Sequence, residues 1–140
     1  MKIFNFCLAL IWFVFLGWIV FRADSGTMPH FLAGLYNYPG GDKIGHFFLM
    51  GSLALLINLA FPAWRLRACH QAVPAGSLLT AAVITLEECS QVLFPTRTFS
   101  LADLTADYLG IIIIGIILFH FIQKLDFSAL KKRFSPLRHP

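Results

Sequence analysis

The sequence predicts an all-α integral membrane protein, a four-helix bundle with both termini in the cytoplasm. Two observations carry this prediction: the chain has too few charged residues for a soluble protein, and its apolar residues form four runs of membrane-spanning length. Of its 140 residues, 58% are hydrophobic and 13% are charged. Soluble domains carry about 25% charged residues, so much of this surface must face lipid.

Four apolar segments supply the predicted transmembrane helices, at about residues 3–21, 44–62, 74–94 and 103–123. Each approaches the roughly 20 residues that cross a hydrocarbon core of about 30 Å. They must be helical, because an isolated strand in lipid would leave its backbone groups unpaired. The first segment runs on into Arg22 without a small-residue cleavage site, which indicates a retained anchor rather than a signal peptide. We expect one domain over residues 1–140, ending in a basic tail at 124–140.

Basic residues are unequally distributed between the two sides that this topology defines. The side with both termini carries eight of the eleven: Lys2, Arg65, Arg67, Lys124, Lys131, Lys132, Arg133 and Arg138. The positive-inside rule places that side in the cytoplasm. Because the basic tail directly follows an apolar helix, the expected partners are membrane lipids of the anionic inner leaflet, and no nucleic acid is expected.

Acidic residues show the opposite asymmetry. Only Asp126 falls on the cytoplasmic side, and the other six lie at or near the predicted outer ends of helices: Asp24, Asp42, Glu87, Glu88, Asp103 and Asp107. Residues three or four apart share a helix face, which pairs Asp42 with His46, Glu88 with Gln91, and Asp103 with Asp107. We expect these pairs to converge at one membrane depth, in a polar cluster that faces outward.

A charge inside an apolar run costs about 2.5–3.5 kcal/mol, so such residues normally face the bundle interior and pair. Arg97 is the expected counter-charge for Glu88 or Asp103, because its guanidinium binds carboxylates bidentately. Simpler roles are open for some of the acids. Asp42 and Asp103 fit helix caps, and Glu87 fits a solvated acid at headgroup level.

Two stretches together resemble a known family. Asp-Lys-x-x-His-Phe at 42–47 is followed by Glu-x-x-Gln-x-x-Phe-Pro-x-Arg at 88–97, and then by Ser-x-x-Asp and Gly110. Over about residues 40–115 this order resembles the VanZ-like family of small polytopic bacterial membrane proteins, whose founding member is linked to resistance to the glycopeptide antibiotic teicoplanin. The resemblance implies a protein of the bacterial cytoplasmic (inner) membrane with a cell-envelope role.

The resemblance also implies a ligand-binding site at the matched positions, which are Asp42, Lys43, His46, Glu88, Gln91, Arg97, Asp103 and Gly110. We add Asp107 to this site. It departs from the family pattern, which usually has Asn there, and the added carboxylate makes the site more acidic.

Three functions remain open for such a site. Lys43 and Arg97 could hold an anionic group, so the pocket is expected to recognise the head group of a lipid-linked cell-envelope intermediate or a similar anionic amphiphile. An enzyme acting on that head group by acid–base or metal-assisted chemistry is the first alternative, with His46, Glu88 and Asp103 as catalytic candidates. The second is an assembly protein whose polar cluster only fixes helix packing. A divalent metal is the one cofactor that these donors suit, with His46 and Glu88 as candidate ligands.

The orientation is directly testable. A reporter fused after Pro140 should be active in the cytoplasm, and one inserted near Thr27 should be active in the outer compartment. Paired fusions to one reporter that works only in the cytoplasm and another that works only outside measure this. A C-terminal fusion active only outside would reverse the orientation.

Overall fold

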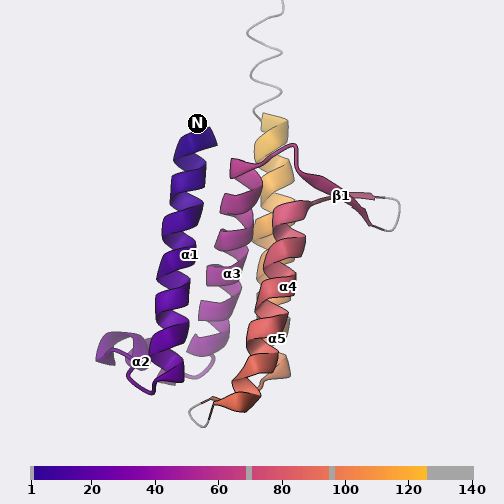
Figure 1. Ribbon diagram of the computed structural model, residues 1–140. Coiled ribbons are helices and arrows are strands. Elements are labelled where there is room, and N and C mark those ends of the chain that lie inside the picture. Colours follow the sequence, from indigo (N-terminus) through magenta and orange to yellow (C-terminus); the bar gives the residue numbers. More distant parts are fainter. Residues whose placement is uncertain (1, 69–70, 95–96, 126–140) are drawn as a thin grey trace, which may run out of the picture.

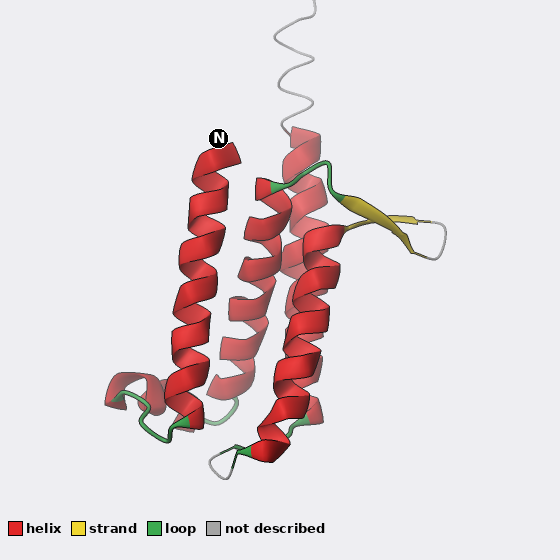
Figure 2. Cartoon of the chain, in the orientation of Figure 1, coloured by secondary structure: helices red, strands yellow, loops and turns green. Residues whose placement is uncertain are grey.

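A computed structural model describes residues 2–68, 71–94 and 97–125. Four long helical segments run side by side (Figure 1): α1 (Lys2–Asp24), α3 (Gly41–Ala60), α4 (Ala75–Ser90), and α5 (Leu101–Gly110) with its π-helical continuation η2 (Ile111–Leu118). A short helix, α2 (His30–Asn37), joins α1 to α3, and a 3₁₀ turn, η1 (Gln91–Leu93), follows α4. The described chain is therefore mostly helical, as predicted (Figure 2).

Three helices are long and apolar enough to cross a membrane, among the residues that the structure describes: Ile3–Asp24, Gly41–Ala60 and Leu101–Leu125. Large apolar side chains such as Phe13 and Ile113 stay about half exposed on these helices, as lipid contact requires. The 16 residues of α4 reach only about 24 Å at 1.5 Å per residue, against a core of about 30 Å. A fourth crossing by α4 therefore stays a prediction.

Two elements were not predicted. One is α2, and the other is an antiparallel hairpin between α3 and α4, formed by β1 (Arg65–Ala68) and β2 (Gln71–Pro74). The hairpin projects from the bundle at the end that also holds the N-terminus (Figure 2). Its base is tied to the last helix, because Arg65 donates to Nε2 of His120 at 3.2 Å and to Oε1 of Gln123.

The centre of the bundle is α3, which packs against α1, α4 and the α5–η2 helix. Glycines allow the approach of α3 to α5–η2. A Cβ on Gly51 would lie 2.7 Å from the carbonyl oxygen of Gly110, and a Cβ on Gly110 would overlap the carbonyl oxygen of Phe47. Only glycine fits at two such facing positions, which lets the backbones of the two helices touch.

Buried polar groups inside the bundle join helices to one another. The amide nitrogen of Asn58 donates to Ser77 Oγ and to the carbonyl of Gly115, both at 2.8 Å. Near the other face of α3, Trp12 donates to the carbonyl of Leu49 at 3.3 Å. Each of these donors would cost several kcal/mol if it were left unpaired in hydrocarbon, so these contacts fix how α1, α4 and η2 sit on α3.

The six acidic residues that the structure describes all lie towards one end of the bundle, which we call the acidic end. They are Asp24 at the end of α1, Asp42 at the start of α3, Glu87 and Glu88 near the end of α4, and Asp103 and Asp107 in α5. The basic tail, with Asp126, falls outside the described residues except for Lys124 and Leu125. The side of the membrane that the acidic end faces stays a prediction.

The glycine contact gives a stability prediction. Gly110→Ala should lower the free energy of unfolding by at least ~1–3 kcal/mol, the usual cost of overpacking, because the new methyl group would meet backbone that cannot move aside. Thermal unfolding of the purified protein in detergent measures this. Gly17→Ala is the matched control, since a Cβ there meets no atom within 4 Å. Equal melting temperatures for the two variants would contradict the close approach of α3 and α5.

Candidate functional site

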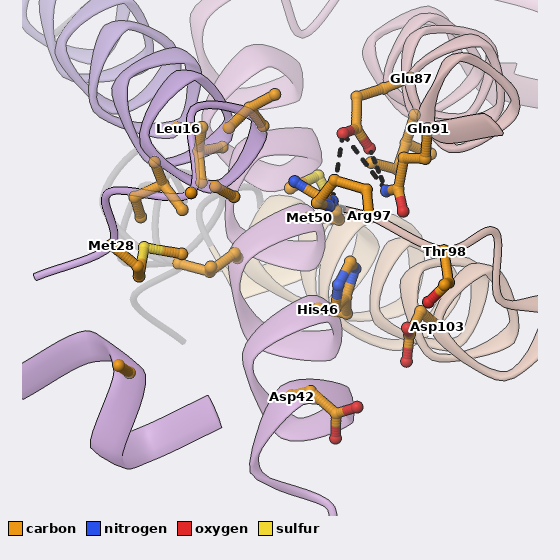
Figure 3. Close-up of a pocket in the computed structure, with 17 residues that line it drawn as sticks. Leu16, Met28, Asp42, His46, Met50, Glu87, Gln91, Arg97, Thr98 and Asp103 are labelled. Atoms are coloured by element: carbon orange, nitrogen blue, oxygen red, sulfur yellow. Dashed lines mark hydrogen bonds and ion pairs between the residues drawn. The ribbon is translucent and has the colours of Figure 1, made fainter. Parts of the chain in front are cut away.

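A cavity of about 580 Å³ lies at the acidic end (Figure 3). Its lining has a polar part and an apolar part. The polar part is Asp42, His46, Glu87, Gln91, Arg97, Thr98 and Asp103, and the apolar part includes Leu16, Ile19, Val20, Met28, Leu49 and Ile84. Cavities that bind small molecules have volumes of about 300–1,000 Å³ and are mostly apolar with a few placed polar groups. This cavity has that size and that mixture.

Lys43 joins the start of α3 to the start of α5. Its ammonium lies 2.7 Å from Oδ2 of Asp42 and 3.0 Å from Oδ1 of Asp103. Ser100 caps α5, since its Oγ accepts from the backbone N–H of Asp103 at 3.2 Å. The capping role considered for Asp42 is not observed. Gly40 occupies the N-cap of α3 with a left-handed φ of 78°, and Asp42 lies inside the first turn, bound to Lys43.

His46 and Asp107 form the second link between α3 and α5. Nδ1 of the imidazole lies 3.0 Å from Oδ1 of Asp107, a carboxylate that is completely buried. The other oxygen of Asp107, Oδ2, is buried without a hydrogen-bond partner. The spacing had paired His46 with Asp42 on one face of α3. The structure instead pairs it across the helix interface, because the glycines bring α5 within reach.

Arg97 has different partners from those expected. Its guanidinium contacts Oδ1 of Asp24 through Nη1 at 3.3 Å and Oε1 of Glu87 through Nη2 at 3.4 Å. The sequence predicted that Arg97 pairs with Glu88 or Asp103, and the structure pairs it with neither. Glu87 is also not a solvated acid, since its side chain is only 18% exposed. These two contacts tie the chain after η1 to the ends of α1 and α4.

Glu88 is completely buried and holds the end of α4 to the start of α5. Its Oε2 accepts from the amide of Gln91 at 2.7 Å, as their three-residue spacing predicts, and its Oε1 accepts from the backbone N–H of Ser100 at 2.7 Å. Gln91 also donates to both carboxylate oxygens of Glu87, at 3.3 and 3.2 Å. Glu88 thus lies behind the cavity wall and supports it.

The structure places most of the predicted site residues around the cavity. Asp42, His46, Gln91, Arg97 and Asp103 line it. Lys43, Glu88 and Asp107 are bonded to lining residues, while Gly110 packs against the backbone of Phe47.

The sequence reasoning missed Asp24 and Glu87 as members of the network. Asp24 is 73 positions from Arg97, and no local spacing rule connects the two. Glu87 had a usable signal, because it is four residues from Gln91 and such residues share a helix face. The predicted partner of Gln91 was Glu88 instead.

The predicted metal ligands do not converge. His46 bonds to Asp107, whereas Glu88 bonds to Gln91 and Ser100. Within the described ranges 2–68, 71–94 and 97–125, no group of three His, Cys, Asp or Glu side chains could hold a metal ion. Binding of a divalent metal stays a prediction.

Comparisons with known proteins give one match. A family model described as VanZ/LLP1 matches residues 3–123, which include all four long helices and the cavity. The motifs had indicated this family over about residues 40–115 only, so the match extends it to α1, α2 and the end of η2. No curated protein and no solved structure matches the chain significantly.

The contacts of Arg97 give a test of whether this network lines a hydrated cavity or forms a closed knot, meaning a set of buried ion pairs from which water is excluded. Asp24 and Glu87 are mostly buried beside Arg97, with side-chain exposures of 21% and 18%. Glu87 and Arg97 nevertheless line the cavity, so removing the Arg97 side chain with an Ala substitution should let water reach the two carboxylates. The expected loss in free energy of unfolding is therefore about 1–2 kcal/mol, above the value for a fully exposed pair. Removing one partner of a fully buried pair would instead cost about 3–5 kcal/mol.

Thermal melts of three variants measure this: Arg97→Ala, Arg97→Met, and Arg97→Met combined with Glu87→Met. We expect all three to melt close to the wild type. A large drop in the single variants that the double variant recovers would establish a closed knot that serves helix packing.

Proposed function

Because the chain belongs to the VanZ/LLP1 family, we propose that it is a membrane protein that binds the polar head group of a membrane amphiphile in the cavity at the acidic end. The single observation that carries this proposal is the two-sided wall of the cavity. An amphiphile has a polar head and an apolar chain joined at one point, and this cavity offers a surface for each part side by side.

The two surfaces lie on opposite sides of the cavity. In Figure 3, Leu16 and Met28 lie on one side, and Glu87, Gln91 and Asp103 lie on the other. The apolar side includes Leu16 and Ile19 of α1, which are turned inward and are only 6% exposed, together with apolar residues of α3 and α4. An alkyl chain that moves there from lipid gains little hydrophobic free energy, because lipid is equally apolar. The apolar side therefore accommodates the chain, while the polar side selects the head group.

The proposed setting follows from the apolar helices. In it the four long helices span the bacterial cytoplasmic membrane as one domain, both termini are cytoplasmic, and the acidic end faces outward. Three helices of spanning length and the unequal distribution of basic residues support this arrangement. An outer-leaflet amphiphile would then reach the cavity directly. Together with the cell-envelope role implied for the family, this favours a lipid-linked cell-envelope intermediate as the ligand.

A second function, an enzyme acting on the same head group, is favoured by the pairing of His46 with Asp107. A buried carboxylate that accepts from Nδ1–H of an imidazole fixes its tautomer and leaves Nε2 as the proton acceptor, the arrangement of a general base and its orienting acid. His46 lines the cavity, so this base would meet a bound head group or a water molecule beside it. Loss of turnover with retained binding in His46→Gln would distinguish this function from binding alone.

Photolabelling tests the binding proposal. The probe is an alkyl glycoside with a diazirine in its chain, added to the purified protein in nanodiscs. We expect labelling of Leu16 and Ile19, which are buried from the surrounding lipid and line the cavity. Ala23→Phe should strongly reduce it, because Ala23 also lines the cavity and a phenyl ring there would occupy the space beside Leu16 and Ile19.

The matched control is Val14→Phe, which places the same ring on the lipid-facing side of α1, where Val14 is 62% exposed. It should leave the labelling of Leu16 and Ile19 unchanged, and both variants should melt close to the wild type. Labelling confined to lipid-facing residues, or equal labelling in the two variants, would show that no amphiphile enters the cavity.

A further inference from the structure

The charges at the acidic end select the head group more narrowly, an inference that rests on the proposed function. Six carboxylates lie there, against three permanent cations, Arg22, Lys43 and Arg97. Even a protonated His46 would leave acids in excess. A site with this imbalance attracts positive charge and repels negative charge, and the effect is strongest where low-dielectric walls concentrate the field.

Arg97, which lines the cavity, and Lys43, which is bonded to lining residues, are already engaged. Arg22, whose Nε is buried without a hydrogen-bond partner among the described residues, does not line the cavity. Lys43 contacts the carboxylates of Asp42 and Asp103, and Arg97 contacts those of Asp24 and Glu87. An anionic head group would have to displace a carboxylate from one of them, and it would then leave that carboxylate unpaired beside a new negative charge. The anionic ligand expected from the sequence required Lys43 and Arg97 to be free.

Acceptor capacity, by contrast, is left over, because a carboxylate can accept about four hydrogen bonds and each carboxylate that lines the cavity accepts three or fewer from the described residues. Asp42, Glu87 and Asp103 all line the cavity, and their side chains remain 32%, 18% and 18% exposed. Behind them, Oδ2 of Asp107 is buried without a partner, although Asp107 is bonded to the lining residue His46. Asp107 does not line the cavity, but its negative charge lies directly behind the wall and strengthens the attraction of the cavity for positive charge.

We infer that the cavity takes an amphiphile whose head group carries a positively charged nitrogen, such as a primary ammonium. A primary ammonium offers three N–H donors on one compact charge, and α3, α4 and α5 each place a carboxylate in the cavity wall that could accept from them. The apolar side of the cavity then holds the attached chain. A lipid-linked envelope intermediate fits the cavity if it bears such an amine, and its amine, rather than a phosphate, is the group that the carboxylates contact.

Competition against the photoreactive glycoside tests the charge of the head group. The competitors share one alkyl chain and differ in the head: dodecylammonium, dodecyl phosphate and dodecyl maltoside. Dodecylammonium should suppress labelling of Leu16 and Ile19 at about tenfold lower concentration than the other two, which corresponds to about 1.4 kcal/mol. Ethylammonium and Mg²⁺ carry the charge without the chain and should not compete at these concentrations.

A variant separates the charge from the shape of the site. Glu87→Gln removes one carboxylate and releases one contact of Arg97, so the preference for dodecylammonium over dodecyl phosphate should fall by about tenfold. Gln71→Lys, on the exposed hairpin at the opposite end, changes the net charge by the same amount and should leave the preference intact.

The outcomes distinguish the two levels of the proposal. Competition by the phosphate or the maltoside as strong as that by dodecylammonium would overturn the inferred charge while keeping the amphiphile site. Equal competition by ethylammonium or Mg²⁺ would replace the amphiphile with a small cation. If none of the three dodecyl compounds competed, and Ala23→Phe did not alter the labelling, the proposed function itself would fail.

Discussion

The spacing between α3 and the α5–η2 helix determines where nearly every functional side chain lies. Gly51 and Gly110 face each other at this interface, and neither position has room for a Cβ. Side chains on the two helices can therefore contact each other directly. Lys43 reaches Asp103, and His46 reaches Asp107 one turn further along each helix. A larger residue at either glycine would separate Lys43 from Asp103 and His46 from Asp107 at the same time.

A second constraint holds α4 and the chain that follows it. Glu88 has no exposed surface, yet its carboxylate accepts two hydrogen bonds, one from Gln91 and one from the backbone of Ser100. Burial of a charge costs several kcal/mol unless such bonds compensate it. Because Ser100 also caps α5, Glu88 fixes the place where α5 begins. The polar network thus has a supporting part behind the wall and a part that lines the cavity.

The sequence predicted helices and the position of the site better than it predicted partners. Apolar run length located α1, α3 and the last helix, and helical spacing related Glu88 to Gln91, since both are local properties of the chain. The partners of Arg97 and His46 could not be predicted in this way. They depend on which helices are adjacent, and helix adjacency follows from small residues such as Gly110, whose contacts appear only in three dimensions.

The short elements were missed for a different reason. Each strand of the hairpin has four residues, too few for an alternating pattern to stand out. The helix α2 has only eight residues and no side-chain cap at its N-terminus, so its apolar pattern is too short to stand out. The helix α4 was predicted to continue to residue 94, but it gives way at Gln91 to a 3₁₀ turn. That turn leads the chain back towards Arg97 and the cavity.

The end of α4 has two faces of opposite character. Leu86 of α4 and Val92 and Leu93 of η1 are 71%, 72% and 80% exposed, whereas Glu87 and Glu88, close by in the chain, turn their carboxylates inward. An apolar skin therefore covers the network where it would meet lipid. Dissolved ions cannot approach through that skin, and the Debye screening that weakens surface charges does not act there. Salt can therefore screen these carboxylates from the cavity but not from this lipid-facing side, so the ionic strength of the medium acts on the field through the cavity.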